Sequence, residues 1–253
     1  MLDAQVEFDK LQQMYKDQER NKTFNAIVYG GMGSGKTQLL RTCRPPIFVD
    51  SFDPGGSLTN RALIEQGKMY VDTRWELEDA AKPFVFELWD KEYHRRKKEE
   101  FFKQLGTYAI DSATTWAATI MNVILRKAGR PATFPFQNDY GPAMSILENA
   151  IKDFTTLPCD CILLCHNNMK TNEAEGKMLV GPLFWGKLVG RIPILFDEIY
   201  HAETKETSAG VKYHLLTRRT GNVEARTRLG ADGKFDTYEE PNIMNLLKKA
   251  GMV

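Results

Sequence analysis

The stretch from Tyr29 to Leu39, YGGMGSGKTQL, limits the fold of this chain more than any other part of its sequence. Gly30, Gly35, Lys36 and Thr37 fill the pattern G-x-x-x-x-G-K-[ST] in full. The apolar run FNAIVYG precedes the glycines and a helix-favouring segment follows them, which is the context that the pattern requires. Glycines let backbone amides turn inward around an anion with no Cβ in the way. The stretch therefore predicts a phosphate-binding loop between a strand and a helix.

The loop residues have separate predicted roles in binding a nucleotide. The first turn of the following helix presents unpaired N–H groups and a positive dipole end to the phosphates. Lys36 is expected to neutralise the β- and γ-phosphates, and the Thr37 hydroxyl to ligate Mg²⁺. ATP is favoured over GTP because the sequence has no Asn-Lys-x-Asp segment that reads guanine. The residues expected to bind ATP are Gly30, Gly31, Met32, Gly33, Ser34, Gly35, Lys36, Thr37 and Gln38.

Short apolar runs alternate with helical segments along the chain. Residues 24–30, 47–50, 107–111 and 159–166 are expected to be strands, while 61–105 is expected to be mostly helical. Such alternation predicts an α/β fold, with a mostly parallel sheet and helices on both faces. After residue 190, the segments IPILFDEIYHAE, VKYHLLTRR and NVEARTRLG predict further strands, and PNIMNLLKKAG predicts a closing helix.

The N-terminal segment is distinct from this core. Residues 1–22 show apolar side chains at a loose helical spacing and predict an amphipathic helix. This helix either covers a sheet edge or docks on a neighbouring subunit, because periodicity alone does not identify what the apolar face packs against. Residues 23–253 are expected to form a single ATPase domain.

Charge and hydropathy limit the possible partners. The net charge is +1, so the chain is not a polycation that coats nucleic acid indiscriminately. The run HRRKKEE is expected to be a solvated helix face, since its charges nearly cancel. No apolar run reaches about 18 residues and the start is not signal-like, which predicts a soluble, cytoplasmic protein without a membrane partner.

Asp111 ends the apolar strand TYAID, where a carboxylate that binds Mg²⁺ belongs in a nucleotide-hydrolysing site. The alternative is that Asp111 caps the next helix. The following residue is Ser112, whereas AAA+ motors and many helicases carry a glutamate there to activate water. The water-activating base must therefore come from another element.

The strand ends offer candidates for this base and for a sensor of the γ-phosphate. Asp50 and Asp53 follow the second strand, which opens on the same edge of a parallel sheet as the loop. Asp53 is the preferred base and Asp50 the second choice, and the alternative is that both merely form a turn. His166 ends the fourth strand and is either a sensor of the γ-phosphate or a structural histidine.

Taken in order, these motifs resemble the RecA-like ATPases of bacteriophages that belong to the single-strand-annealing recombination group. The resemblance covers most of residues 24–230 and rests on YGGMGSGKT, VDSFDPGG, AIDSATTW, FQNDYG, LLCHNN, GKLVGRIPILFDEIY and ARTRLG. It implies ATP as ligand, a RecA-type core, self-assembly into rings or filaments, and single-stranded DNA as partner. A single-strand-binding protein is a further candidate partner, and the location would be the host cytoplasm. Family patterns often have a glutamate where this chain has Phe52-Asp53, which puts the identity of the base in doubt.

The segment 167–187 is long for a mere connector and combines cations with aromatic side chains. This combination suits neutralisation of a nucleic-acid backbone and stacking of bases, although PLFWGKL equally suits packing. The candidate DNA-binding residues are Lys170, Lys177, Phe184, Trp185 and Lys187.

Period-2 alternation in VEARTR sends Arg226 and Arg228 to one face of an expected strand. Two guanidinium groups aimed together suit a phosphate, and the resemblance implies the γ-phosphate held by an adjacent subunit. The alternative is a sheet edge protected by charge.

The predicted function is that of an ATP-hydrolysing recombination protein which oligomerises and binds single-stranded DNA for annealing or strand exchange. A nucleotide-gated scaffold with little hydrolysis is a serious alternative because no glutamate follows Asp111. An AAA+ motor or loader normally adds that glutamate and a helical lid. A small-molecule kinase would need an arginine-rich lid between strands.

Overall fold

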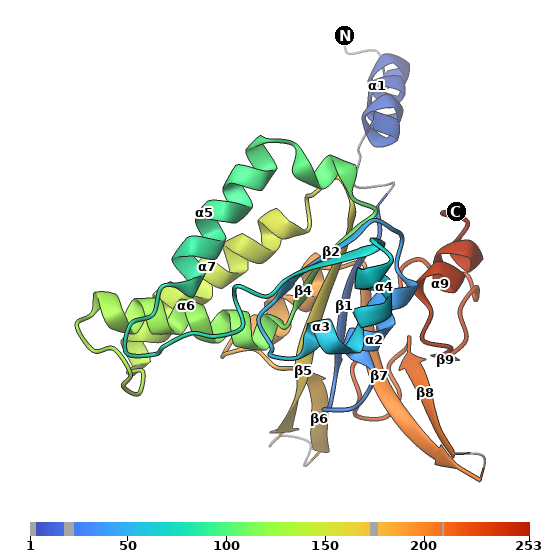
Figure 1. The fold of residues 1–253 in the computed structure, drawn as a ribbon. Coiled ribbons are helices and arrows are strands. Elements are labelled where there is room, and N and C mark those ends of the chain that lie inside the picture. The colour runs from blue at the N-terminus through green and yellow to red at the C-terminus, as the bar shows by residue number, and fades with distance from the viewer. Residues whose placement is uncertain (1–3, 18–22, 173–176, 209) are drawn as a thin grey trace.

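The computed structural model describes residues 4–17, 23–172, 177–208 and 210–253. In this part of the chain, nine strands form one mixed sheet with helices on both of its faces (Figure 1). The strands are β1 (Asn25–Gly30), β2 (Ile47–Ser51), β3 (Met69–Asp72), β4 (Thr107–Asp111), β5 (Asp160–Asn172), β6 (Lys177–Pro182), β7 (Glu198–Thr207), β8 (Gly210–Leu216) and β9 (Tyr238–Glu239). The α-helices are α1 (Ala4–Asp17), α2 (Lys36–Leu39), α3 (Gly56–Thr59), α4 (Arg61–Glu65), α5 (Val85–Lys98), α6 (Ala113–Lys127), α7 (Gln137–Phe154), α8 (Leu188–Arg191) and α9 (Ile243–Ala250). Short 3-10 helices are η2 (Leu40–Thr42), η3 (Phe101–Gln104) and η4 (Pro193–Leu195).

Six neighbouring strands run parallel, in the order β3-β2-β4-β5-β1-β7. The strands β8 and β9 continue the sheet antiparallel to their neighbours, and β6 pairs with the outer part of β5. Because the six strands share one direction, their carboxyl ends meet at one edge, where open α/β sheets bind ligands. The predicted α/β fold, with a mostly parallel sheet, helices on both faces and C-terminal antiparallel strands, is confirmed.

The central strands are buried on both faces, and successive residues alternate between two hydrophobic cores. In β1, Ile27 and Tyr29 belong to the core that contains side chains of α5, α6 and α7. Ala26 and Val28 belong to the other core, which contains side chains of α2 and α9. Burial on both faces explains the near-continuous apolar runs of the sequence. The alternation also decides which strand-end side chains face the phosphate loop.

Asp50 lies on the α5 side of β2 and is fully buried. Its carboxylate accepts hydrogen bonds from Trp75 Nε1 (2.9 Å), Trp89 Nε1 (2.8 Å) and the Tyr108 hydroxyl. Arg96 lies 3.1 Å away and opposes the rise in the pKa of Asp50 that burial causes. The prediction that Asp50 activates water is wrong, because strand alternation turns its carboxylate into the core and away from the loop.

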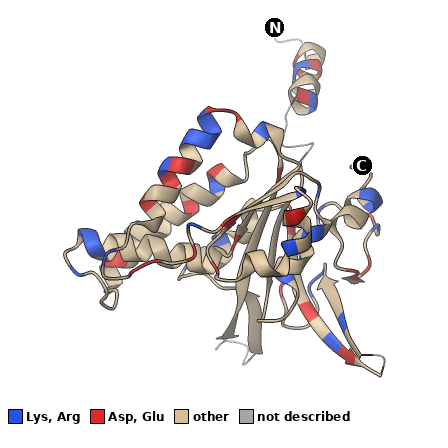
Figure 2. Ribbon diagram, in the orientation of Figure 1, with Lys and Arg blue, Asp and Glu red and all other residues tan. Residues whose placement is uncertain are grey.

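Arg96 is the buried cation that balances this network. It pairs with Asp72 at 2.6 Å as well as with Asp50. The run HRRKKEE is therefore only in part the solvated face that was expected. Its neighbour Arg95 is exposed and pairs with Glu92 of α5 and with Glu99, which caps this helix. Figure 2 shows that basic and acidic residues lie close together along α5.

Three segments differ from the expectations drawn from sequence. Residues 61–105 contain the strand β3 and an irregular stretch before α5, so they are less helical than expected. Much of the segment 167–187 forms the β5–β6 hairpin rather than a loop. Residues 222–230 form isolated bridges and no strand. In the first two segments, pairing with a distant or neighbouring strand decides the conformation, and local patterns do not reveal such pairing.

Helix α1 lies within the N-terminal segment where an amphipathic helix is predicted. None of its residues is buried, and its apolar residues Val6, Phe8 and Leu11 are each more than half exposed. The helix therefore does not cover a sheet edge, and docking on a neighbouring subunit stays a prediction, as does the domain division after residue 22. Among the described helices, none has both the length and the apolarity needed to cross a membrane.

The substitution Asp50→Ala tests the buried network. It leaves Arg96 without one anion and removes the acceptor of three other side chains, so we expect the free energy of unfolding to fall by about 3–5 kcal/mol. Urea denaturation followed by far-ultraviolet circular dichroism measures this change. The control is Arg61→Ala, which breaks an exposed pair with Glu65 and should cost less than about 1 kcal/mol. Equal losses in the two variants would show that Asp50 has no special structural role.

Candidate nucleotide-binding site

The loop between β1 and α2 has a backbone that requires glycine at several positions. A Cβ added to Gly30 would lie 2.4 Å from the carbonyl oxygen of Ala202, and Gly33 and Gly35 have φ angles of +73° and +87°. The Oγ of Ser34 is buried and has no hydrogen-bond partner among the described residues. Phosphate oxygens are acceptors that satisfy such a hydroxyl and the inward-facing amides of a glycine-rich loop. The loop therefore fits the phosphate group that the sequence predicts.

The side chain of Lys36 lies inside this loop. Its Nζ donates hydrogen bonds to the carbonyl oxygens of Gly30 and Gly31, both at 2.8 Å. Burial lowers the pKa of Lys36, and the nearby Asp111 opposes this change. The ammonium group is thus held where a lysine can neutralise phosphates bound by the loop. By contrast, the Met32 side chain is 93% exposed, so only its backbone is placed to contribute.

Thr37 and Asp111 meet across the tips of α2 and β4. The Thr37 hydroxyl donates to Asp111 Oδ2 at 2.7 Å. Burial raises the pKa of Asp111 to about 6, and the hydrogen bond from Thr37 opposes the rise. The helix-cap alternative for Asp111 is wrong, because Ser112 is the residue that caps α6. A hydroxyl and a carboxylate side by side are oxygen ligands of the kind that Mg²⁺ prefers.

Asp53 lies just after the end of β2 and His166 lies within β5, where the sequence predicted the strand to end, and their side chains also meet. The Nε2 of His166 lies 3.1 Å from Asp53 Oδ2, within hydrogen-bond distance, and the Thr115 hydroxyl donates to Asp53 Oδ1. The backbone N–H of Asp53 donates to the carbonyl oxygen of Asp111 at 3.1 Å. Since His166 is in register with Gly30 of β1, the preferred base and the proposed sensor lie together beside the phosphate loop.

Two adjoining hollows extend from the loop. One of about 260 Å³ is lined by residues 33–38 with Thr59 and Tyr213. The second, of about 140 Å³, is lined by Gln38, Arg41, Pro241 and the same tyrosine. Because Tyr213 packs against the loop and contributes to both hollows, it suits the base or ribose of a nucleotide whose phosphates the loop binds. The sequence gives no signal for Tyr213, which reaches the site only through the pairing of β8 with β7.

Arg226 and Arg228 do not project together from one strand. The guanidinium group of Arg226 donates to the carbonyl oxygens of Pro193 (2.9 Å) and Phe196 (2.6 Å) of its own chain. Arg228 pairs with Asp197 at 2.7 Å and is half-exposed. The prediction that Arg226 and Arg228 share one face of a strand is therefore wrong, because residues 222–230 form no strand. A role at a neighbouring subunit's γ-phosphate stays a prediction, and Arg228 is better placed for it.

The candidate DNA-binding residues divide into two groups. Lys170 and Lys177 lie on the paired strands of the β5–β6 hairpin, but their side chains are outside the described part of the structure. Phe184 is buried in the core and Trp185 packs on Tyr140, so the packing alternative is correct for Phe184 and is favoured for Trp185. Lys187 is exposed.

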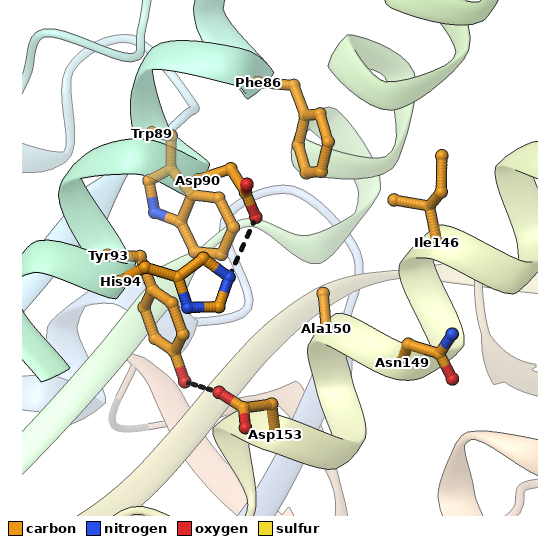
Figure 3. A pocket seen from close by; sticks show the side chains of 9 residues that line it. All are labelled: Phe86, Trp89, Asp90, Tyr93, His94, Ile146, Asn149, Ala150 and Asp153. Atoms are coloured by element: carbon orange, nitrogen blue, oxygen red, sulfur yellow. Dashed lines mark hydrogen bonds and ion pairs between the residues drawn. The ribbon is translucent and has the colours of Figure 1, made fainter. Parts of the chain in front are cut away.

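Another cavity, of about 380 Å³, lies between α5 and α7 (Figure 3). Figure 3 shows that Tyr93 donates its hydroxyl to Asp153, while His94 faces Asp90. This cavity is formed by helices that cover one face of the sheet, away from the strand ends that carry the phosphate loop. It is therefore not part of the nucleotide site.

The fold and the site together define an α/β domain with a phosphate-binding loop of the P-loop type. Residues 22–229 match the family described as an AAA domain (AAA_24), and the chain belongs to this family. No curated protein matches the sequence. Solved structures that resemble the chain include a KaiC-like protein from Pyrococcus horikoshii, at 14% identity and a TM-score of 0.44 over 81% of this chain and 82% of that one. They also include the flagellar accessory protein FlaH from Methanocaldococcus jannaschii, at 12% identity and a TM-score of 0.45 over 88% of each chain.

The substitution Lys36→Ala tests the phosphate loop. Charged hydrogen bonds contribute roughly 1.5–3 kcal/mol each, so losing this cation should weaken ATP binding by about 100-fold while leaving the unfolding curve unchanged. Isothermal titration calorimetry measures the affinity. Lys68→Ala removes an exposed cation outside the site and serves as the control. Unchanged ATP affinity in the Lys36 variant would contradict the assignment.

The raised pKa of Asp111, about 6, predicts how Mg²⁺ affects binding at different pH. A protonated carboxyl is a poor metal ligand, so the gain in ATP affinity on adding Mg²⁺ should fall as pH drops through about 6. The loss should approach tenfold per pH unit below this value. Titrations with and without Mg²⁺ between pH 5 and 8 measure the gain. Asp111→Asn should show a small, pH-independent gain; equal pH profiles would assign the titration to the nucleotide itself.

Proposed function

We propose that this chain binds ATP with Mg²⁺ and hydrolyses it. The observation that carries the proposal is the Thr37–Asp111 hydrogen bond, which brings a hydroxyl from the phosphate-loop helix and a buried carboxylate to one point. Bound there, Mg²⁺ would neutralise charge on the β- and γ-phosphate oxygens. The residues that would hold it are Thr37 and Asp111, and both fit because their oxygens already lie within hydrogen-bond distance.

The chain's own groups perform the remaining tasks of hydrolysis. The loop amides and Lys36 bind the phosphates and stabilise the charge that develops on them. Asp53 and His166 lie beside this position as a linked carboxylate–imidazole pair. Loss of the γ-phosphate beside this pair would shift His166 and so displace β5, because His166 lies within that strand.

We further propose single-stranded DNA as partner, in a phage recombination protein that assembles into rings or filaments for annealing or strand exchange. The motif order in the sequence supports this group. The structure adds one supporting feature: β5 runs without interruption from Asp160 through His166 to Asn172 and so joins the nucleotide site to the β5–β6 hairpin. A strand that is continuous in this way transmits a displacement at the site to cations on the hairpin.

A nucleotide-gated scaffold with little hydrolysis is the second candidate. It is favoured by Ser112, which stands where many motors have a glutamate, and by Asp53, whose two carboxylate oxygens already have partners. An AAA+ motor or loader is less supported, because in the described part of the chain the only α-helix after residue 200 is α9.

The partner is tested by measuring ATP turnover with and without single-stranded DNA. We expect several-fold stimulation that weakens as salt rises, because binding to a nucleic-acid backbone releases counterions. Heparin is the control for any polyanion, and Lys36→Ala gives the background rate. Turnover without stimulation and without DNA binding would leave an ATPase of another kind. ATP binding without turnover would favour the scaffold.

A further inference from the structure

The segment between β3 and α5 brings an additional carboxylate to the strand tips. Glu76 Oε1 accepts a hydrogen bond from the Ser51 hydroxyl at 2.7 Å. Ser51 is fully buried at the end of β2 and is in register with Asp111 of β4. Neighbouring residues in register on parallel strands present their side chains to the same face of the sheet. Glu76 therefore reaches the face on which Asp111 meets Thr37.

The glycine turn after β2 shows how close these groups lie. A Cβ added to Gly56 would be 3.1 Å from Ser51 Oγ, 3.7 Å from Asp111 Oδ2 and 3.9 Å from Thr37 Cγ2. The side chains of Ser51, Asp111 and Thr37 thus surround one small space. Glu76 lies next to this space, because it accepts a hydrogen bond from Ser51. A side chain larger than hydrogen at Gly56 would enter this space.

The position of Glu76 is fixed by its neighbour in the chain. Trp75 is buried and donates its Nε1–H to Asp50 at 2.9 Å, which ties the segment to the opposite face of β2. The N–H of Glu76 donates to the carbonyl oxygen of Thr73 at 3.2 Å and closes a turn. The buried Asp50 network therefore holds the backbone that presents Glu76, although Asp50 itself takes no part in the site.

Asp53 and Glu76, the two candidates for the general base, differ in what their carboxylate oxygens already bind. Asp53 uses one oxygen for the Thr115 hydroxyl and the other for His166. Glu76 is half-buried, uses Oε1 for Ser51, and has no partner on Oε2 among the described residues. A general base needs an accessible oxygen within reach of the attacking water. Glu76 meets this requirement better than Asp53.

We infer that Glu76 is the carboxylate that activates water for hydrolysis of ATP at this site. Its Oε2 accepts a proton from the water while the water oxygen bonds to the γ-phosphorus. The bond between the γ-phosphorus and the β–γ bridging oxygen breaks, its electron pair stays on ADP, and the products are ADP, inorganic phosphate and one proton released to solvent. This inference rests on the proposed ATP hydrolysis. Asp53, through its contact with His166, then serves to position the sensor rather than to take the proton.

The substitution Glu76→Gln tests this role. A glutamine oxygen still accepts the Ser51 hydrogen bond, so a purely structural role predicts near-normal turnover. A general base contributes roughly 10²–10⁴-fold, so we expect turnover to fall by about 100-fold or more while the affinity for ATP·Mg²⁺ stays within a factor of about two. Release of inorganic phosphate in single-turnover mixing measures the chemical step, and calorimetry measures the affinity.

Matched variants separate the possible results. Asp79→Asn removes an exposed carboxylate three residues away and should leave turnover unchanged. Ser51→Ala removes the hydrogen bond but keeps the Glu76 carboxylate, so its loss of turnover should be smaller than that of Glu76→Gln. Turnover within about threefold of wild type in Glu76→Gln, with a large loss in Asp53→Asn, would overturn the inference and return the base to Asp53. If the wild-type chain binds ATP but does not turn it over, the proposed hydrolysis itself fails.

Discussion

The hydrogen bond between Thr37 and Asp111 is the interaction on which the rest of the site depends. It joins α2, the helix that follows the phosphate loop, to the end of β4. In the sheet, β5 lies between β4 and β1, the strand that leads into the loop. Such a meeting requires the strands to be parallel and in register, because only then do their carboxyl ends share one edge. The buried carboxylate is tolerable because it is hydrogen-bonded and lies beside Lys36. A metal-bound nucleotide would complete the same charge balance.

The strand β2 has different tasks on its two faces. Asp50 faces the helices α5–α7 and gathers the indole, phenol and guanidinium groups of three elements into one buried network. Ser51 faces the phosphate loop and binds Glu76. Because Trp75 belongs to the first network and Glu76 follows it directly, the core on one face determines the geometry of the site on the other.

The sequence predicts the parts of this structure that local patterns encode. The glycine loop, the order of alternating strands and helices, and the places of Lys36 and Asp111 beside that loop follow from short motifs whose context is visible in the chain. The contributions of Tyr213 and Glu76 could not be predicted, since each reaches the site through long-range pairing or a buried anchor. The prediction that Asp50 could activate water was wrong for a related reason: a position at the end of a strand does not determine the face of the sheet on which the side chain lies.

The most direct test of the central claim is a crystal structure with Mg²⁺ and a non-hydrolysable ATP analogue. The account predicts that the Thr37–Asp111 hydrogen bond is replaced by one Mg²⁺ ion, with Thr37 Oγ1 at about 2.1 Å and Asp111 bound directly or through a water molecule. The triphosphate should lie in the loop within reach of Lys36. A metal ion held elsewhere, or an intact Thr37–Asp111 bond beside bound nucleotide, would contradict it.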